Sequence, residues 1–166
     1  MSTADAPLAL SAEESAHIAA LAAHGETPRS ACIEALTYIQ SRHGWVDNDR
    51  LAAAASLLGM SAAELDSVAT FYNLIFREPV GRQVIFLCDS VSCWIMGRER
   101  VCAKLRERLG ISQGETTADG AYTLLPIVCL GHCDHAPAML IGETLYGDVD
   151  AAQLDGIFPP AGAGHE

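Results

Sequence analysis

Apolar residues in the first half of the chain recur at intervals of three and four, the spacing of one face of an α-helix. Residues able to cap a helix precede the apolar segments: Ser11, Thr27 ahead of Pro28, Asp47 or Asn48, and Ser61. Glutamate follows Ser11 and Ser61 three residues later, which completes the capping-box pattern. The sequence therefore predicts four short helices that form a small bundle over residues 11–80.

The periodicity changes after residue 80. Residues 84–87 are a continuous apolar run, typical of a buried strand, and the run ends directly at Cys88. The elements expected after it are a helix over about 95–109, a strand over 122–128, a hairpin of 138–141 and 144–146, and a helix over 151–157. Pro126 indicates an edge strand or a bulge, and Asp148 is expected to cap the last helix.

The order β-α-β-β-α over residues 81–158 predicts a compact α/β sandwich behind the helical bundle, so the fold class is α+β. Residues 1–10 and the Pro/Gly/Ala-rich residues 159–166 are expected to be mobile ends.

Composition narrows the class of protein. Half of the residues are hydrophobic and 19% are charged, which is enough apolar material for a core. The net charge of −11 repels phosphate backbones and anionic lipid, so we expect no nucleic-acid partner. Since no apolar run approaches the roughly 18 residues of a membrane span and the N-terminus lacks a secretory pattern, we expect a cytoplasmic protein without direct membrane insertion.

Four of the six cysteines form two pairs. Four residues separate Cys88 from Cys93, three separate Cys129 from Cys133, and each pair follows an apolar strand. If the two strands are neighbours in the sheet, their loops meet at one edge, where four thiolates can converge on an iron–sulfur cluster or a metal ion.

The spacing leaves three kinds of site open: a [2Fe–2S] cluster, a zinc ion, and thiols without metal. A binuclear cluster suits the wider loops, because each iron takes two thiolates and the centre is longer than one ion. Structural zinc pairs more often have two intervening residues, although four is within range. Redox-active dithiols also usually have two.

The remaining candidate side chains have simpler interpretations. Cys32 and Cys102 lie on apolar helix faces and are expected to be core residues. His132 and His135 flank Cys133, but four cysteines leave little need for histidine ligation. Asp89 and Asp134 each follow a cysteine and are expected to cap loops.

Several enzyme motifs are absent from the sequence: the G-x-G-x-x-G fingerprint, the phosphate-binding P-loop and H-E-x-x-H. We therefore expect no catalytic residues, and electron transfer rather than substrate chemistry from this chain alone. The alternatives are a zinc-binding structural subunit, a thiol oxidoreductase and a freely diffusing ferredoxin.

The combined motifs resemble the E subunit of bacterial NADH:quinone oxidoreductase, respiratory complex I. The resemblance spans about residues 11–157 and is carried by VATFY at 68–72, FREPVGR at 76–82, the pair Cys88 and Cys93, and CLGHC at 129–133. It implies a thioredoxin-like fold with an N-terminal helical extension, and one [2Fe–2S] cluster on Cys88, Cys93, Cys129 and Cys133.

The resemblance also implies partners and a location. The chain would pack against the subunit that binds FMN and NADH, next to a multi-cluster iron–sulfur subunit, in the cytoplasmic peripheral arm of the membrane-attached complex. Equivalent cluster subunits of NAD-dependent formate dehydrogenases and bidirectional hydrogenases are the alternative hosts.

Overall fold

The computed structural model describes residues 10–158, and the chain divides into two compact units between Pro79 and Val80. Each unit has its own buried apolar core. The predicted mobile ends, 1–10 and 159–166, lie outside the described residues apart from Leu10.

The first unit is the expected set of helices. They are α1 (Ala12–His24), a 3-10 turn (Pro28–Ala31), α2 (Cys32–His43), α3 (Asn48–Leu57) and α4 (Ala62–Phe71). Both predicted capping boxes are present, at Ser11 and at Ser61. Asp47 is the cap of α3 and accepts hydrogen bonds from two backbone N–H groups. Thr27 makes no capping bond, because Pro28 begins a 3-10 turn and α2 starts only at Cys32.

Apolar faces of all four helices meet in the core of this unit. Its buried residues include Ile18, Leu36, Ile39, Leu51, Leu58 and Leu65. Cys32 is partly buried and packs against this core, as expected for a small apolar side chain.

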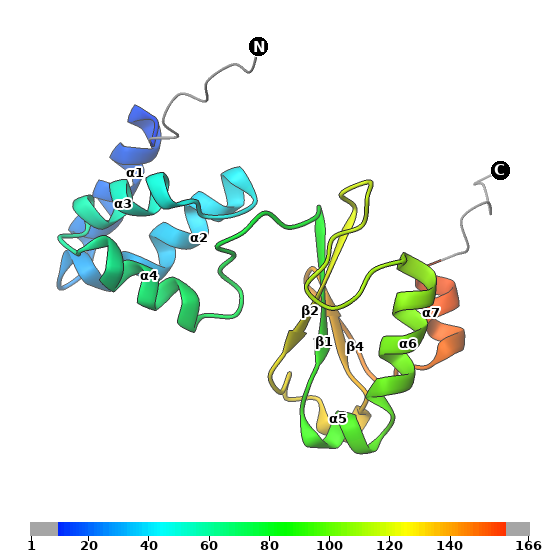
Figure 1. Ribbon diagram of the computed structural model, residues 1–166. Helices are drawn as coiled ribbons and strands as arrows, with labels where there is room; N and C mark the ends of the chain where they lie inside the picture. The colour runs from blue at the N-terminus through cyan, green and yellow to red at the C-terminus, as the bar shows by residue number, and fades with distance from the viewer. Residues whose placement is uncertain (1–9, 159–166) are drawn as a thin grey trace, which may run out of the picture. The chain divides into compact units, whose positions relative to one another are not determined.

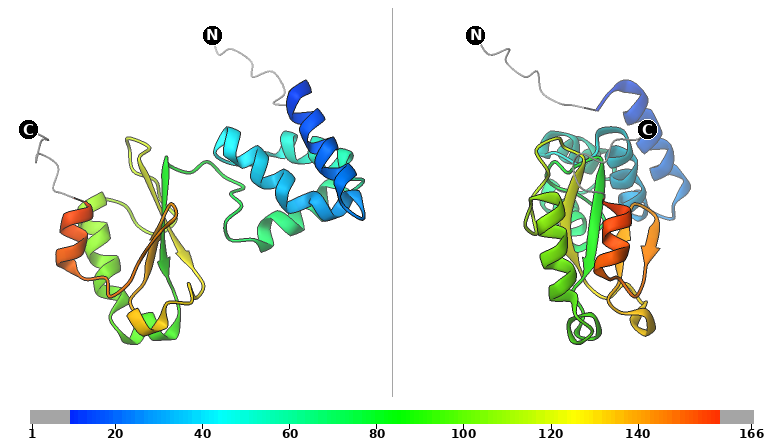
Figure 2. Two further views of the ribbon diagram at one scale, coloured as in Figure 1. Left: turned by 180° about the vertical axis from the view of Figure 1, so that it is seen from behind. Right: turned by 90° about the vertical axis from the view of Figure 1, so that its right-hand side faces the viewer.

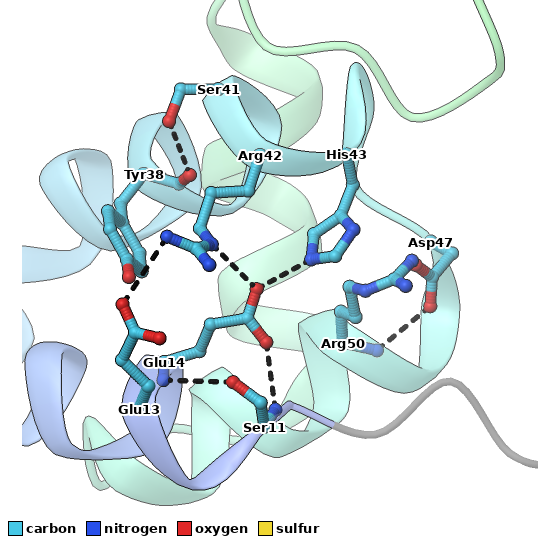
Figure 3. Close-up of polar contacts among 9 residues, drawn as sticks. All are labelled: Ser11, Glu13, Glu14, Tyr38, Ser41, Arg42, His43, Asp47 and Arg50. Atoms are coloured by element: carbon cyan, nitrogen blue, oxygen red, sulfur yellow. Dashed lines mark hydrogen bonds and ion pairs between the residues drawn. The ribbon is translucent and has the colours of Figure 1, made fainter.

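A buried carboxylate joins the start of α1 to the end of α2 (Figure 3). Glu14 is 4% exposed; it accepts a hydrogen bond from the Ser11 N–H at 2.8 Å and contacts His43 Nε2 at 2.6 Å and Arg42 Nε at 3.3 Å. The Ser11 N–H is the main cause that brings the pKa of Glu14 down to about 2; burial acts in the opposite direction, and His43 adds to the lowering. The ionised form of Glu14 therefore stabilises the folded unit.

The second unit contains a four-stranded sheet in the order β2-β1-β3-β4. Its elements are β1 (Gln83–Cys88), α5 (Val91–Ile95), α6 (Arg98–Leu109), β2 (Tyr122–Ile127), a 3-10 turn (Cys133–His135), β3 (Met139–Ile141), β4 (Thr144–Tyr146) and α7 (Ala151–Ile157). The strand β1 pairs parallel with β2 and antiparallel with β3. Helices α6 and α7 cover the same face of the sheet (Figures 1 and 2).

The core of the second unit lies between that face and the two helices. It includes Ile85, Leu87, Leu105, Leu124, Met139 and Leu154, and Cys102 packs against it from α6. Arg108 on α6 donates to Asp155 on α7 and so ties the two helices together. Pro126 lies on the edge strand β2, as predicted, where a missing N–H costs no ladder bond within the sheet.

The helix expected over about 95–109 is present as α6, which begins at Arg98. The short helix α5 before it was not expected; Gly97, in a left-handed conformation (φ 108°), separates the two. The predicted cap of the last helix was wrong. The cap of α7 is Asp150, whose side chain accepts from the Gln153 N–H at 2.8 Å. Asp148 instead bonds to His135.

Within residues 10–158 no single helix is long and apolar enough to cross a bilayer; α3 and α4 reach that length and composition only as a pair bent by 112°.

Replacing Glu14 tests the buried carboxylate. Glu14→Gln is expected to lower the free energy of unfolding of the first unit by about 1–3 kcal/mol at neutral pH, because it removes a charged hydrogen-bond partner. Since folding lowers the pKa of Glu14, its stabilisation is complete above about 4.5 and is lost as the pH falls toward 2. Urea unfolding at pH 7 and pH 3, followed by Trp45 fluorescence in a Trp94→Phe background, measures both effects.

The matched control is Glu13→Gln, because the exposed carboxylate of Glu13 contacts only the edge of the same network, 3.5 Å from Arg42. Glu13→Gln should stay within about 0.5 kcal/mol of the parent protein. Equal losses of stability between pH 7 and pH 3 in the parent and in Glu14→Gln would contradict the assignment.

Candidate functional site

The two strands that carry the cysteine pairs are parallel neighbours, which is the condition under which the sequence predicted that the pairs meet. Cys88 is the last residue of β1 and lies beside Ile127, the last residue of β2, so Cys129 follows two residues beyond the same sheet edge. The Asp89 N–H donates to the Ile127 carbonyl at 2.7 Å and holds the two loops together where they leave the sheet.

The first pair is buried. Cys88 and Cys93 are each 1% exposed and pack with Ala136, Ala138 and the partly buried Leu130. Cys93 lies in α5, the short helix that the sequence did not reveal. That helix folds the first loop back, so that the side chains of Cys88 and Cys93 interact.

The surroundings shift the pKa values of Cys88 and Cys93 in opposite directions. Burial opposes ionisation of Cys88, but the hydrogen bond between its Sγ and the Ser90 Oγ, at 3.4 Å, and a hydrogen bond from the Leu130 N–H outweigh it and lower the pKa of Cys88. Burial is the largest influence on Cys93, and together with the neighbouring Cys88 it raises the pKa of Cys93 against a hydrogen bond from the Ala138 N–H.

The second pair is exposed. The Sγ atoms of Cys129 and Cys133 lie 3.3 Å apart, and the Gly131 N–H donates to Cys129 Sγ at 3.4 Å. Gly131 has a left-handed conformation (φ 78°), which turns the loop within three residues and favours glycine at this position. The hydrogen bond with Cys129 and then its charge raise the pKa of Cys133.

Contacts also join the two pairs. The Leu130 N–H from the second loop reaches Cys88, and Ser92 from the first loop hydrogen-bonds to Cys133. Cys93 and Cys133 lie close enough for their charges to interact. The fold thus brings all four predicted residues to one edge of the sheet.

The thiols form two adjacent pairs rather than one point of convergence. In the part of the chain from 10 to 158, no three His, Cys, Asp or Glu side chains surround one point closely enough to hold a single metal ion. The donor set nevertheless fits a binuclear cluster: there are two thiols for each iron, and backbone N–H groups of Leu130, Gly131 and Ala138 point at sulfur.

The sequence did not single out Arg98, a buried charged residue that pairs with Asp89. Arg98, at the start of α6, is 5% exposed and lies with its Nε 3.0 Å from Asp89 Oδ1, although the two are not aligned as a hydrogen bond. Its Nη1 donates to Glu99 at 2.8 Å. The Asp89 carboxylate, predicted to cap its loop, thus balances a buried guanidinium. In the sequence, a glycine followed by an arginine directly after an apolar segment could have indicated a helix that starts with a charged residue here.

The histidine rings of the second loop lie against one another at an angle of 33°. The rings of His132 and His135 have centroids 4.7 Å apart, and His135 Nδ1 lies 2.7 Å from Asp148 Oδ2. A hydrogen bond to Asp148, followed by the charges of Asp134 and Asp148, raises the pKa of His135.

Comparison with known proteins gives the family. Residues 18–160 match the family model described as thioredoxin-like [2Fe-2S] ferredoxin. The chain is 50% identical over 126 residues to the E subunit of NADH-quinone oxidoreductase from Pseudomonas aeruginosa, covering 76% of each protein. It is 51% identical over 120 residues to the protein of the same name from Escherichia coli strain K12, covering 72% of each.

A solved structure has a similar fold. The crystal structure of an NAD+-reducing [NiFe]-hydrogenase in the H2-reduced state matches with a TM-score of 0.68 and 28% identity over 78% of this chain. The match spans 22% of that hydrogenase chain, so the corresponding segment there is part of a much longer polypeptide. The predicted thioredoxin-like fold class is confirmed, and the chain belongs to the thioredoxin-like [2Fe-2S] ferredoxin family, in the branch formed by the E subunits of NADH-quinone oxidoreductases.

Proposed function

We propose that Cys88, Cys93, Cys129 and Cys133 hold one [2Fe–2S] cluster through which this protein passes single electrons within NADH-quinone oxidoreductase. The observation that carries the proposal is the meeting of two thiol pairs at one sheet edge, where Cys129 and Cys133 lie 3.3 Å apart. When bound, the cluster would supply a reversible one-electron couple. The chain's own contribution is to position the thiols and to direct N–H groups at them.

The pairwise arrangement favours a binuclear centre over structural zinc. A single zinc ion takes four ligands at tetrahedral positions around one point. Here one pair is buried and the other is exposed. The pairs are joined by the hydrogen bond from Leu130 to Cys88, by the hydrogen bond between Ser92 and Cys133, and by the charge interaction of Cys93 with Cys133. Such an elongated donor set matches two metal ions with two thiolates each.

Replacing one thiol tests the ligation. Cys93→Ser is expected to lose most of its iron or to change the EPR spectrum of the reduced protein, because serine oxygen replaces a thiolate at one iron. The matched control is Cys102→Ser, since Cys102 packs against the core through α6. We expect two irons, two sulfides and one spin-half signal in the parent and the control. A colourless parent protein with one zinc would refute the ligation.

We further propose that the edge carrying the cysteines faces the subunit that binds FMN and NADH. Electron transfer weakens steeply with distance, so the partner's redox group has to approach this edge. Large apolar side chains are exposed around the thiols: Val91 (69%), Trp94 (63%), Ile95 (68%) and Met96 (57%) on and just after α5, and Val128 (68%) beside Cys129. Apolar groups gathered in this way are typical of protein interfaces.

The hydrogenase match supports a permanent partner. In that NAD+-reducing protein the related segment belongs to a longer chain, so there it is covalently joined to other parts. The identity is 50% to an E subunit of NADH-quinone oxidoreductase and 28% to the hydrogenase chain, which favours the former complex as host over a hydrogenase. We place the chain in the cytoplasmic peripheral arm, next to a multi-cluster iron–sulfur subunit.

An acidic substitution in α5 tests the docking surface. Trp94→Glu is expected to weaken association with the FMN-binding subunit by about 2 kcal/mol or more, because it places a charge at the centre of an apolar contact. The cluster content should stay unchanged, since Trp94 is exposed. Co-purification of the tagged protein from cells and quantification of bound FMN measure the association.

Leu145→Glu is the control, because Leu145 is also an exposed apolar residue (44%) but lies on the edge strand β4. It should co-purify like the parent. Normal assembly of Trp94→Glu, with a full cluster, would reject α5 as the docking surface and leave the ligation intact.

A further inference from the structure

The loop between β4 and α7 lies alongside the turn that carries Cys133. The Asp148 N–H donates to the His135 carbonyl at 2.7 Å, and the Val149 N–H donates to the Pro137 carbonyl at 3.0 Å. These two bonds attach a loop more than ten residues away in the sequence to the backbone just after Cys133.

A side-chain contact strengthens this attachment. His135 Nδ1 and Asp148 Oδ2 lie 2.7 Å apart. Asp148 is in the left-handed region (φ 49°), which aspartate tolerates better than most residues. Its unusual backbone directs the carboxylate to His135 instead of to the N-terminus of α7, which Asp150 caps.

Gly147 allows the two segments to approach. A Cβ at Gly147 would lie 2.6 Å from His132 Nε2 and 2.6 Å from His135 Cβ, closer than real Cβ contacts allow. The backbone of Gly147 is not in the left-handed region, so only the space excludes a side chain. Both obstructing residues flank Cys133, and displacing them would move its thiol.

We propose that Gly147 and Asp148 are positioning residues for Cys133, so that the β4–α7 loop sets the geometry of the exposed thiol pair without touching it. The inference rests on the proposed ligation. Cys129 Sγ and Cys133 Sγ lie 3.3 Å apart, and this distance depends on the conformation of the turn that contains Cys133 and ends at His135. Groups that orient metal ligands from behind typically alter metal affinity 10- to 100-fold when they are replaced.

A pair of glycine substitutions tests the space requirement. Gly147→Ala is expected to speed iron loss to a chelator at least about tenfold and to shift the EPR g values and midpoint potential of the reduced cluster. Gly156→Ala is the matched control, because a Cβ at Gly156 in α7 meets nothing within 4 Å. Adding His132→Ala to Gly147→Ala removes one of the two contacts and should restore part of the parent behaviour.

Substitutions of Asp148 test the same positioning role through the contact with His135, and they apply even if Gly147→Ala does not fold. Asp148→Gly tolerates the left-handed backbone but loses the contact with His135, and should speed iron loss. Asp148→Asn keeps both an acceptor and the backbone preference, and should behave like the parent. EPR spectra, potentials and iron-loss rates that match the parent in both Gly147→Ala and Asp148→Gly would overturn the proposal.

The metal-free protein gives a readout that does not depend on a cluster. Glutathione disulfide can oxidise the thiols of Cys129 and Cys133 to a disulfide and is itself reduced to two molecules of glutathione. Gly147→Ala should change the rate of this step severalfold, whereas Gly156→Ala should not, with the bond located by mass spectrometry. Equal rates in all variants would contradict the positioning role, and a wild-type chain that binds no iron would refute the ligation separately.

Discussion

The parallel pairing of β1 with β2 is the constraint on which the site depends. Parallel strands end at the same edge of a sheet, so Cys88 and the loop after Ile127 emerge together. The antiparallel neighbour β3 brings Ala138 to the same place, where its carbonyl accepts from the Cys88 N–H at 3.1 Å. The sheet therefore sets where the loops leave it, and the backbone N–H groups of Leu130 and Gly131 in the second loop reach the thiols from there.

The sequence predicted features that local chemistry determines. The capping boxes at Ser11 and Ser61 need only residues three positions apart, and both are present. The strand that ends at Cys88 was recognisable because a buried parallel strand is a continuous apolar run. The common edge of the two cysteine pairs was expected only if their strands are neighbours, and the sheet order makes them so.

Features that depend on distant residues were predicted poorly. Asp148 resembles a helix cap, but its partner is His135, thirteen residues earlier in the sequence. The break between α5 and α6 depends on the backbone of Gly97, which a helical pattern does not reveal. The difference in burial between the cysteine pairs depends on packing by Ala136 and Ala138, both far from Cys88 in the sequence.

The electrostatics of the thiols explain why this edge suits a cationic centre. Within each pair one sulfur hinders ionisation of the other: Cys88 contributes to the raised pKa of Cys93, and Cys129 is the main cause of the raised pKa of Cys133. Four thiolates would add negative charge to a chain that already carries −11. The N–H groups of Leu130, Gly131 and Ala138 point at thiol sulfurs and favour their ionised form. An iron–sulfur core bound at this edge would stabilise the thiolates further, because metal binding stabilises thiolates directly and releases their protons. An edge with four thiols and converging N–H groups agrees with the cluster that the family binds.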